Sequence, residues 1–174
     1  MDNHILPECY LDTMLTETLV KPVSGYNHQK GCSTVTSKMQ NCKSLKDSFA
    51  VGILDDDKKQ TPYLNELKLL ANKSGLRLYK HPQKHHYLIL HPPIEQWILD
   101  EAKSANIDLS AYDLPDERSA LQKQTKTATS KHDSRFKRLF RDLKAGDSFN
   151  RLSNWLCYLK QHPYDACIEH LQHL

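Results

Sequence analysis

Short apolar runs predict four strands in the first 105 residues of the chain. The runs within residues 3–8 and 49–54 are bounded by polar or turn-forming residues, as in strands buried on both faces of a sheet. Residues 76–79 and 87–90 are similar runs. The segments between these runs differ, because several of them repeat apolar residues every three or four positions.

Those segments predict helices. Apolar residues at helical spacing fill residues 11–19, and a second helix is expected over residues 32–39. Another is predicted to begin at Thr61-Pro62 and to end at Gly75, with proline in its first turn and glycine as its C-cap. A further helix follows Pro92-Pro93. This order predicts an α/β fold, with a mainly parallel, open sheet flanked by helices.

Beyond residue 105 the pattern becomes helical. Residues 115–131 are polar and largely without periodicity, so we expect a loop or linker there. Amphipathic helices are predicted over residues 134–144 and 149–161, followed by a short final helix. We therefore predict an α/β domain over residues 1–105 and a helical extension over residues 106–174.

Composition excludes several classes of protein. Hydrophobic residues make up 39% of the chain and charged residues 26%, as in globular domains. No apolar run approaches the length of a membrane span, and the first residues lack the features of a signal peptide. The five cysteines form no CxxC pair, which favours free thiols in a reducing compartment. We therefore predict a cytoplasmic protein without membrane contact.

Acidic residues follow two of the predicted strands. Glu8 ends the first strand, with Asp12 one helical turn later, and Asp55-Asp56-Asp57 follows the second. The carboxyl ends of parallel strands meet at the edge of a sheet where ligands bind. Asp55 and Asp57 share one face of an extended chain. Glu95, just beyond a later strand, could join them. Carboxylates gathered in this way predict a Mg²⁺ or Mn²⁺ site suited to phosphate chemistry.

The same residues also have plainer explanations. Three aspartates after a strand can form a solvated turn. Glu8 and Glu95 can each stabilise the positive end of a helix without binding any ligand. A zinc site is not predicted, because the four histidines of residues 81–91 and the scattered cysteines lack compact ligand spacing.

In this order the acidic motifs resemble those of the TOPRIM fold, the metal-binding domain of topoisomerases, primases and OLD-family nucleases. The resemblance lies in residues 7–12, 54–57 and 93–99, and the turn at residues 31–35 is similar to the family's glycine-led second turn. It covers residues 1–105. The chain departs from the pattern at Cys9, where the family often has glycine.

The resemblance implies a Mg²⁺- or Mn²⁺-dependent nuclease subunit that cleaves DNA phosphodiesters. Glu8, Asp55 and Asp57 would be catalytic and would hold the metal, with Asp12 and Glu95 as additional ligands. Separately encoded TOPRIM proteins resemble components of bacterial anti-phage defence systems. An ABC/SMC-type ATPase on another chain is therefore the expected partner, and self-association into a homo-oligomer is left open.

Other functions compete with this interpretation. A non-catalytic, partner-binding module could keep the fold and use its helical extension as an interface. A phosphatase of the DxD type fits less well, because Lys58 stands where such enzymes usually have threonine or valine. A receiver-like phosphoacceptor domain would need its acidic pair and lysine in a different order.

Basic residues supply the candidate nucleic-acid contacts. Residues 121–144 carry a local charge of +6 in a chain whose net charge is +3. The cations of the helix over residues 134–144 avoid its apolar face, so they could contact phosphates or form a solvated surface. Lys137 near its start is predicted to reach the metal edge and to neutralise charge in the transition state. The other predicted contacts are His28, Lys30, Lys131, Arg135, Arg138 and Arg141.

Overall fold

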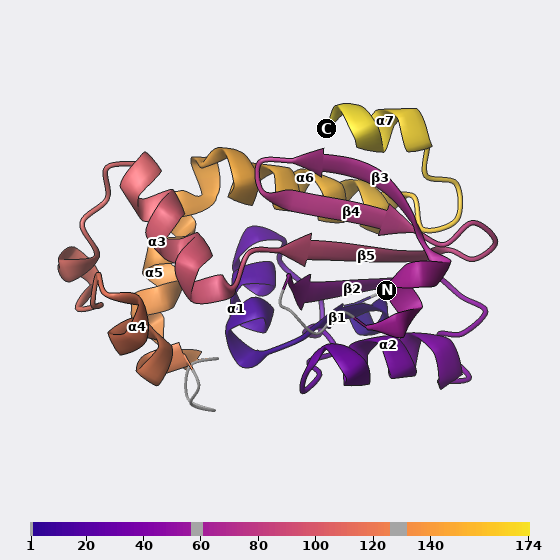
Figure 1. The fold of residues 1–174 in the computed structure, drawn as a ribbon, viewed down its shortest axis with the longest axis horizontal. Coiled ribbons are helices and arrows are strands. Elements are labelled where there is room, and N and C mark those ends of the chain that lie inside the picture. The colour runs from indigo at the N-terminus through magenta and orange to yellow at the C-terminus, as the bar shows by residue number, and fades with distance from the viewer. Residues whose placement is uncertain (1, 57–60, 126–131) are drawn as a thin grey trace.

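A five-stranded sheet in the order β1-β2-β5-β4-β3 forms the centre of the molecule (Figure 1). The computed structural model describes residues 2–56, 61–125 and 132–174. The strands are β1 (Ile5–Pro7), β2 (Ala50–Asp55), β3 (Lys68–Lys73), β4 (Leu76–Lys80) and β5 (His86–His91).

Strands β1, β2 and β5 are parallel, whereas β4 is antiparallel to β5 and β3 is antiparallel to β4. In this register Ile5 pairs with Val51, and Asp55 pairs with His91. The carboxyl ends of β1, β2 and β5 therefore meet at one edge of the sheet. The α/β prediction is confirmed, with a mixed sheet whose centre is parallel.

Strand β3 and its turn into β4 occupy most of the segment for which one helix from Thr61-Pro62 to Gly75 was predicted, so that prediction is wrong. The strand predicted over residues 76–79 is confirmed as β4. Only Pro62–Glu66 is helical, as a short 3-10 helix. Ser74 and Gly75 have φ angles of 54° and 75°, which suits the two-residue turn between twisted antiparallel strands. The backbone hydrogen bonds of the hairpin outweigh the helical spacing of its few apolar residues.

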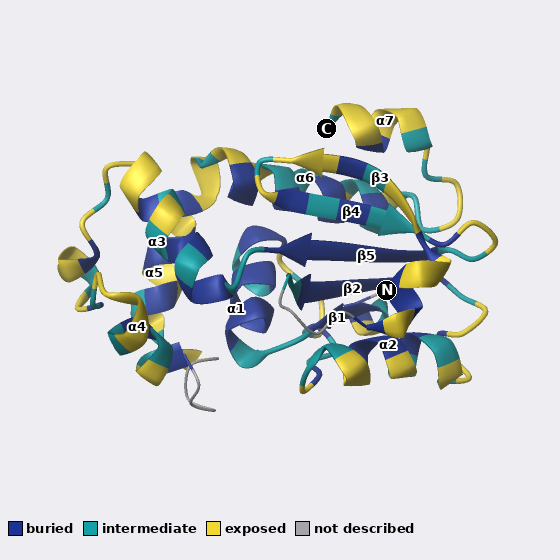
Figure 2. Cartoon of the chain, in the orientation of Figure 1, coloured by how far each residue is buried: buried dark blue, intermediate teal, exposed yellow. Residues whose placement is uncertain are grey.

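Helices cover both faces of the sheet, and the burial of the strands follows from this (Figures 1 and 2). Alternate residues of a strand face opposite sides, so Ile5 belongs to the hydrophobic cluster that contains α1 (Tyr10–Leu19) and Leu6 to the one that contains α2 (Cys32–Asn41). Strand β5 is buried throughout, whereas β3 exposes most of its residues.

The C-terminal part contributes apolar residues to the same cluster as α1. Among the described residues, no helix has both the length and the apolar character needed to cross a membrane. Over residues 2–56, 61–125 and 132–174, the remaining α-helices are α3 (Ile94–Ser104), α4 (Arg118–Thr125), α5 (Ser134–Asp142), α6 (Asp147–Gln161) and α7 (Ile168–His173). Short 3-10 helices also occur at Asp2–His4, Leu109–Tyr112 and Leu143–Ala145.

Helix α4 lies within the polar stretch that was predicted to be a loop, so that prediction is wrong for its residues. Its start is satisfied by Glu117, whose carboxylate accepts hydrogen bonds from the backbone N–H groups of Ser119 and Ala120. Leu121 is its buried anchor in the core. Residues 126–131 of the predicted loop lie outside the described residues.

Candidate metal centre

Three adjacent strands deliver polar side chains to one edge of the sheet. Glu8 follows β1, Asp55 ends β2 and His91 ends β5. Two helices begin beside these strand ends and bring in Asp12 from α1 and Glu95 from α3. The four predicted carboxylates that the structure describes therefore gather at this edge, whereas Asp57 lies outside the described residues.

The innermost group consists of Asp12, Asp55 and His91. One potential ligand atom from each lies within 4.8 Å of the others. The His91 Nε2 atom is 3.4 Å from Asp12 Oδ1, and the His91 Nδ1 atom is 3.4 Å from Asp55 Oδ1. The Asp12 and His91 residues are 1% and 0% exposed, so this is a buried cluster rather than a patch of surface acids.

A capping interaction fixes Asp12 in this position. Cys9 is the N-cap of α1, and its backbone N–H donates to Asp12 Oδ2 at 3.1 Å. The Asp12 backbone N–H in turn donates to the Cys9 sulfur at 3.3 Å. Thus Oδ2 of Asp12 accepts the hydrogen bond that caps the N-terminus of α1, whereas Oδ1 points toward His91.

Two buried atoms of the cluster lack hydrogen bonds within the described part of the chain. They are Asp12 Oδ1 and His91 Nε2. They face one another at 3.4 Å, as a long ion pair when His91 is protonated and as two facing electron-pair donors when it is neutral. In the neutral state each unsatisfied atom costs about 1–3 kcal/mol. The His91 Nδ1 atom lies 2.8 Å from the Pro92 carbonyl oxygen, to which it can donate its proton. In the neutral ring Nε2 then presents a lone pair, as a metal-binding histidine does.

The charges of this cluster depend on one another. Burial raises the pKa of Asp55 to about 7, and the neighbouring Asp12, Glu8 and Glu95 carboxylates add to the rise while His91 opposes it. Burial alone would lower the pKa of His91, but Asp12 and Asp55 outweigh it and raise that pKa to about 9. Near neutral pH the positive charge of the protonated His91 imidazole therefore offsets the negative charge of the neighbouring carboxylates. A metal ion bound by Nε2 would have to displace the proton on that nitrogen.

Glu8 and Glu95 lie around this group and are held by hydrogen bonds. The backbone N–H of Asp55 donates to Glu8 Oε2 at 3.0 Å. The buried Glu95 accepts a hydrogen bond from the Thr125 hydroxyl at 2.5 Å, which connects α4 to the site. Asp56 differs from its neighbour Asp55, because it forms an ion pair with Arg77 of β4.

The C-terminal part also supports the centre through Trp97. The Trp97 indole stacks on the His91 ring, with the ring centroids 4.9 Å apart and the planes inclined by 26°. Its N–H donates to the Ser148 hydroxyl of α6 at 2.5 Å, and Ser148 donates to Glu101 at 2.6 Å. The position of His91 thus depends on a residue that lies 57 positions further along the chain.

The basic residues predicted to contact nucleic acid fall into separate places. His28 and Lys30 line a cleft beside Glu8. The exposed Lys137 lines another cavity, on the α1 side, with Glu17 and Thr18. Arg135 forms an ion pair with Asp133 at 2.6 Å and also donates to the Asp113 carbonyl oxygen at 2.9 Å.

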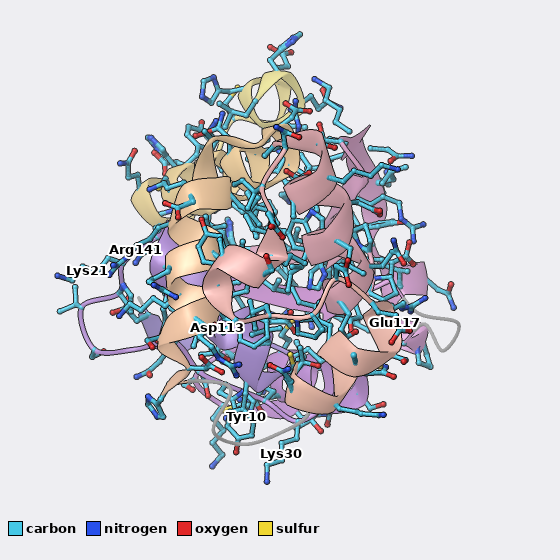
Figure 3. All side chains as sticks on the ribbon, turned by 90° about the vertical axis from the view of Figure 1, so that its left-hand side faces the viewer. Tyr10, Lys21, Lys30, Asp113, Glu117 and Arg141 are labelled. Atoms are coloured by element: carbon cyan, nitrogen blue, oxygen red, sulfur yellow. The ribbon has the colours of Figure 1, made fainter. Side chains whose placement is uncertain are left out.

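Helix α5 carries the remaining cations. The Arg138 guanidinium lies 5.7 Å from the centre of the Tyr112 ring, and the exposed Arg141 extends outward on the same side as Lys21 (Figure 3). These two arginines are exposed, and they lie one helical turn apart on α5. Lys131 lies outside the described residues.

Sequence reasoning missed His91, although a signal for it was present. It ends an apolar strand in the way that Asp55 does, but it was grouped with the other histidines of residues 81–91. Applying the same strand-end argument to β5 would have found it. The roles of Cys9 and Thr125 had no comparable signal, because cysteine is not among the preferred N-cap residues and the Thr125 contact with Glu95 is tertiary.

Comparisons with models of protein families, with curated proteins and with solved structures gave no match. The TOPRIM resemblance therefore stays a prediction that rests on the sequence motifs.

Proposed function

We propose that this chain is a metal-dependent, TOPRIM-like nuclease subunit that hydrolyses DNA phosphodiesters, and that it works with an ABC/SMC-type ATPase on a separate chain in anti-phage defence. The observation that carries the proposal is the buried pair of atoms Asp12 Oδ1 and His91 Nε2, which face one another at 3.4 Å beside the Asp55 carboxylate and have no hydrogen bond within the described residues. A divalent cation would satisfy both atoms at once, because it accepts electron pairs from a carboxylate and from an imidazole together.

The ligand types indicate which ion suits the centre. Asp12 and Asp55 offer oxygen, which Mg²⁺ and Mn²⁺ prefer, and His91 offers nitrogen, which Mg²⁺ rarely takes. We therefore propose Mn²⁺ as the better fit of the two. A bound divalent ion would supply Lewis-acid chemistry, polarising a phosphoryl oxygen and activating a water molecule for attack.

The residues of the chain would then have distinct roles. Asp12, Asp55 and His91 hold the ion. Glu8 lines the neighbouring cleft and accepts a hydrogen bond from the Asp55 backbone, so it contacts both the cleft and a residue that would hold the ion. Its carboxylate is the group that we propose accepts a proton from the attacking water. Glu95 accepts a hydrogen bond from the Thr125 hydroxyl, and we propose that it fixes the position of α4 beside the metal ligands.

The nuclease proposal is tested by phosphodiester hydrolysis with Mn²⁺, using plasmid DNA and bis(p-nitrophenyl) phosphate, with and without an added ABC/SMC-type ATPase that co-purifies with this chain. Asp55→Asn should reduce hydrolysis by roughly 100-fold or more, because one ligand loses its charge. Asp56→Asn is the matched control, since Asp56 pairs with Arg77 instead, and it should keep most of the activity. Equal rates in wild type and Asp55→Asn would overturn the proposal, as would Mn²⁺ binding without hydrolysis of either substrate under both conditions.

Contact with DNA is proposed for the exposed cations of α5. Replacing Arg138 and Arg141 with glutamate should weaken binding to all DNA sequences alike and flatten the salt dependence, by close to one unit of slope for each phosphate contact. Replacing Lys43 and Lys68 with glutamate makes the same charge change at exposed positions elsewhere. Unchanged binding and salt slope in a folded Arg138 and Arg141 variant would mark this helix as a solvated or protein-binding surface.

A further inference from the structure

A cleft of about 250 Å³ lies beside the metal centre. Two stretches that are distant in sequence form it, namely the start of α1 and the segment that leads into α2. Its lining includes Glu8, Tyr10, His28, Lys30, Gly31 and Thr125.

The segment leading into α2 is fixed along the outer edge of β1. The backbone N–H groups of Asn27 and Gln29 donate to the carbonyl oxygens of Ile5 and Pro7, at 3.0 and 2.9 Å. The Gly31 N–H donates to the Glu8 carbonyl at 3.2 Å. This wall of the cleft is therefore held by main-chain hydrogen bonds to the strand that carries Glu8.

One wall presents flat aromatic surface. The rings of Tyr10 and His28 are stacked, with centroids 4.0 Å apart and planes inclined by 14°, and both residues are half-buried. The Thr13 hydroxyl donates to the Cys9 carbonyl, which leaves it to accept from His28 Nδ1 at 3.1 Å. The aromatic wall is thus preorganised, and a planar group could stack on it with little loss of side-chain entropy.

The rim of the cleft carries a positive charge. Lys30 is exposed at its rim, next to Tyr10 in Figure 3. Gly31 is the N-cap of α2 with a φ of +92°, and no described residue lies within 4 Å of a Cβ atom added there. The N-terminus of this helix adds the positive end of its dipole, which favours an anion.

The cleft is also continuous with the metal centre. Glu8 lines the cleft and binds the Asp55 backbone. Thr125 lines it from the other side and donates to Glu95. A ligand in the cleft would thus touch two residues that contact the centre directly.

We infer that the cleft binds one nucleotide of single-stranded DNA, with its base against Tyr10 and His28 and a phosphate near Lys30 and Gly31. Its volume is below the roughly 300–1,000 Å³ of pockets for drug-sized ligands, so one base fits better than a base pair. A base inside a duplex has both faces covered by its neighbours, whereas an unpaired base can stack on an aromatic side chain. This inference rests on the proposed function and restricts its substrate to single-stranded ends, gaps or flaps.

The test compares the binding of a labelled single strand and of the duplex of the same sequence, with Ca²⁺ in place of Mn²⁺. Tyr10→Leu should weaken single-strand binding by about 10-fold, because one stacking contact is lost, and should leave duplex binding unchanged. Tyr10→Phe keeps the ring and should stay within about 2-fold of wild type. Lys30→Ala should weaken single-strand binding more than duplex binding, and it provides a second test if Tyr10→Leu fails to fold.

Equal losses for single strand and duplex in Tyr10→Leu, or no loss in a folded variant, would overturn the inference. The nuclease proposal can fail separately. If single-strand binding depends on Tyr10 while Asp55→Asn hydrolyses as fast as wild type, the cleft stands and the nuclease proposal falls. If hydrolysis requires Asp55 and the binding of neither DNA form responds to Tyr10 or Lys30, only the cleft assignment falls.

Discussion

Strand β5 begins with His86 and ends with His91, and both residues are 0% exposed. The His86 ring has neutral partners on both sides, the Leu45 carbonyl at 2.9 Å from Nε2 and the Tyr63 hydroxyl at 2.5 Å from Nδ1. Burial lowers its pKa. The His91 ring lies between two carboxylates, and its pKa rises to about 9.

The comparison shows that the charge of the neighbouring groups, rather than the extent of burial, determines whether a buried histidine is neutral or protonated. His86 is satisfied as a neutral group and joins the core at one end of the strand. The His91 Nε2 atom faces Asp12 Oδ1 at 3.4 Å, longer than an ordinary hydrogen bond, and carries a proton that a metal ion could replace. The two residues therefore provide matched controls for one another, within one strand and at equal burial.

The largest expected effect is on metal affinity. His91→Gln should weaken Mn²⁺ binding at pH 8 by at least roughly 100-fold, since changing mere outer partners of metal ligands already costs about 10–100-fold. His86→Gln should bind Mn²⁺ like the wild type. Isothermal titration or the Mn²⁺ paramagnetic resonance signal measures this. Equal affinities in the two variants would remove His91 from the centre.

The next effect is the pH dependence of stability without metal. The folded pKa of His91, about 9, lies above the unfolded value of 6.5, so its contribution is present below pH 6.5 and is lost as the pH rises through 9. The raised pKa of Asp55 likewise makes the free energy of unfolding fall as the pH rises, up to about pH 7. The wild type should lose on the order of 2 kcal/mol of unfolding free energy between pH 6.5 and 9.

Urea denaturation at several pH values measures this loss, and His91→Gln should show a flatter profile. His86 acts with the opposite sign. The pKa of His86 is lower in the folded chain than in the unfolded chain. The unfolded chain therefore binds the proton more readily, and His86 reduces the free energy of unfolding only as the pH falls below 6.5. An equally steep fall above pH 6.5 in His91→Gln would contradict the assignment.

A smaller effect is expected from Tyr63→Phe, at the other end of β5. It removes the partner of His86 Nδ1 and should cost about 1–2 kcal/mol of unfolding free energy, because one buried group is left unsatisfied. Mn²⁺ affinity should not change. A loss of affinity equal to that of His91→Gln would show that the two ends of the strand are coupled.

The smallest effect is expected from Trp97→Leu, which removes the ring stacked on His91 but no ligand. Mn²⁺ affinity should fall on the order of 3-fold, less than the loss of a hydrogen-bonded outer partner. Trp155→Leu is the control, since Trp155 is also buried but bonds to the Leu171 carbonyl instead. Equal metal affinities in the two variants, measured while both are folded, would exclude a role for the stack.

Sequence patterns predicted the secondary structure correctly where the spacing of apolar residues matches only one kind of element. The run over residues 49–54 has no competing helical period, and its carboxyl end locates Asp55 correctly at the sheet edge. The segment from Lys68 to Lys73 fits both periods, and only pairing with β4 decides between them. Helix α4 was missed because a polar surface helix with a single strong anchor, Leu121, resembles a loop.

The candidate site could also be predicted only in part. Strand ends indicated Glu8, Asp12, Asp55 and Glu95, because the edge of a parallel sheet is set by topology. The protonation of His91 and the hydrogen bond from Thr125 could not be predicted, since both arise from contacts between segments far apart in sequence. The positions of the cations on α5 relative to the centre likewise depend on tertiary packing.

The contact between Trp97 and Ser148 has a consequence for how this chain could be inherited or recombined. An α/β unit cut at residue 105 would keep every proposed metal ligand, but it would lose the hydroxyl that holds the indole ring behind His91. The Phe149 ring also packs edge-on against Trp97, with centroids 4.6 Å apart. A grafted C-terminal part would therefore have to bring a matching serine and aromatic neighbour to keep the indole ring behind His91.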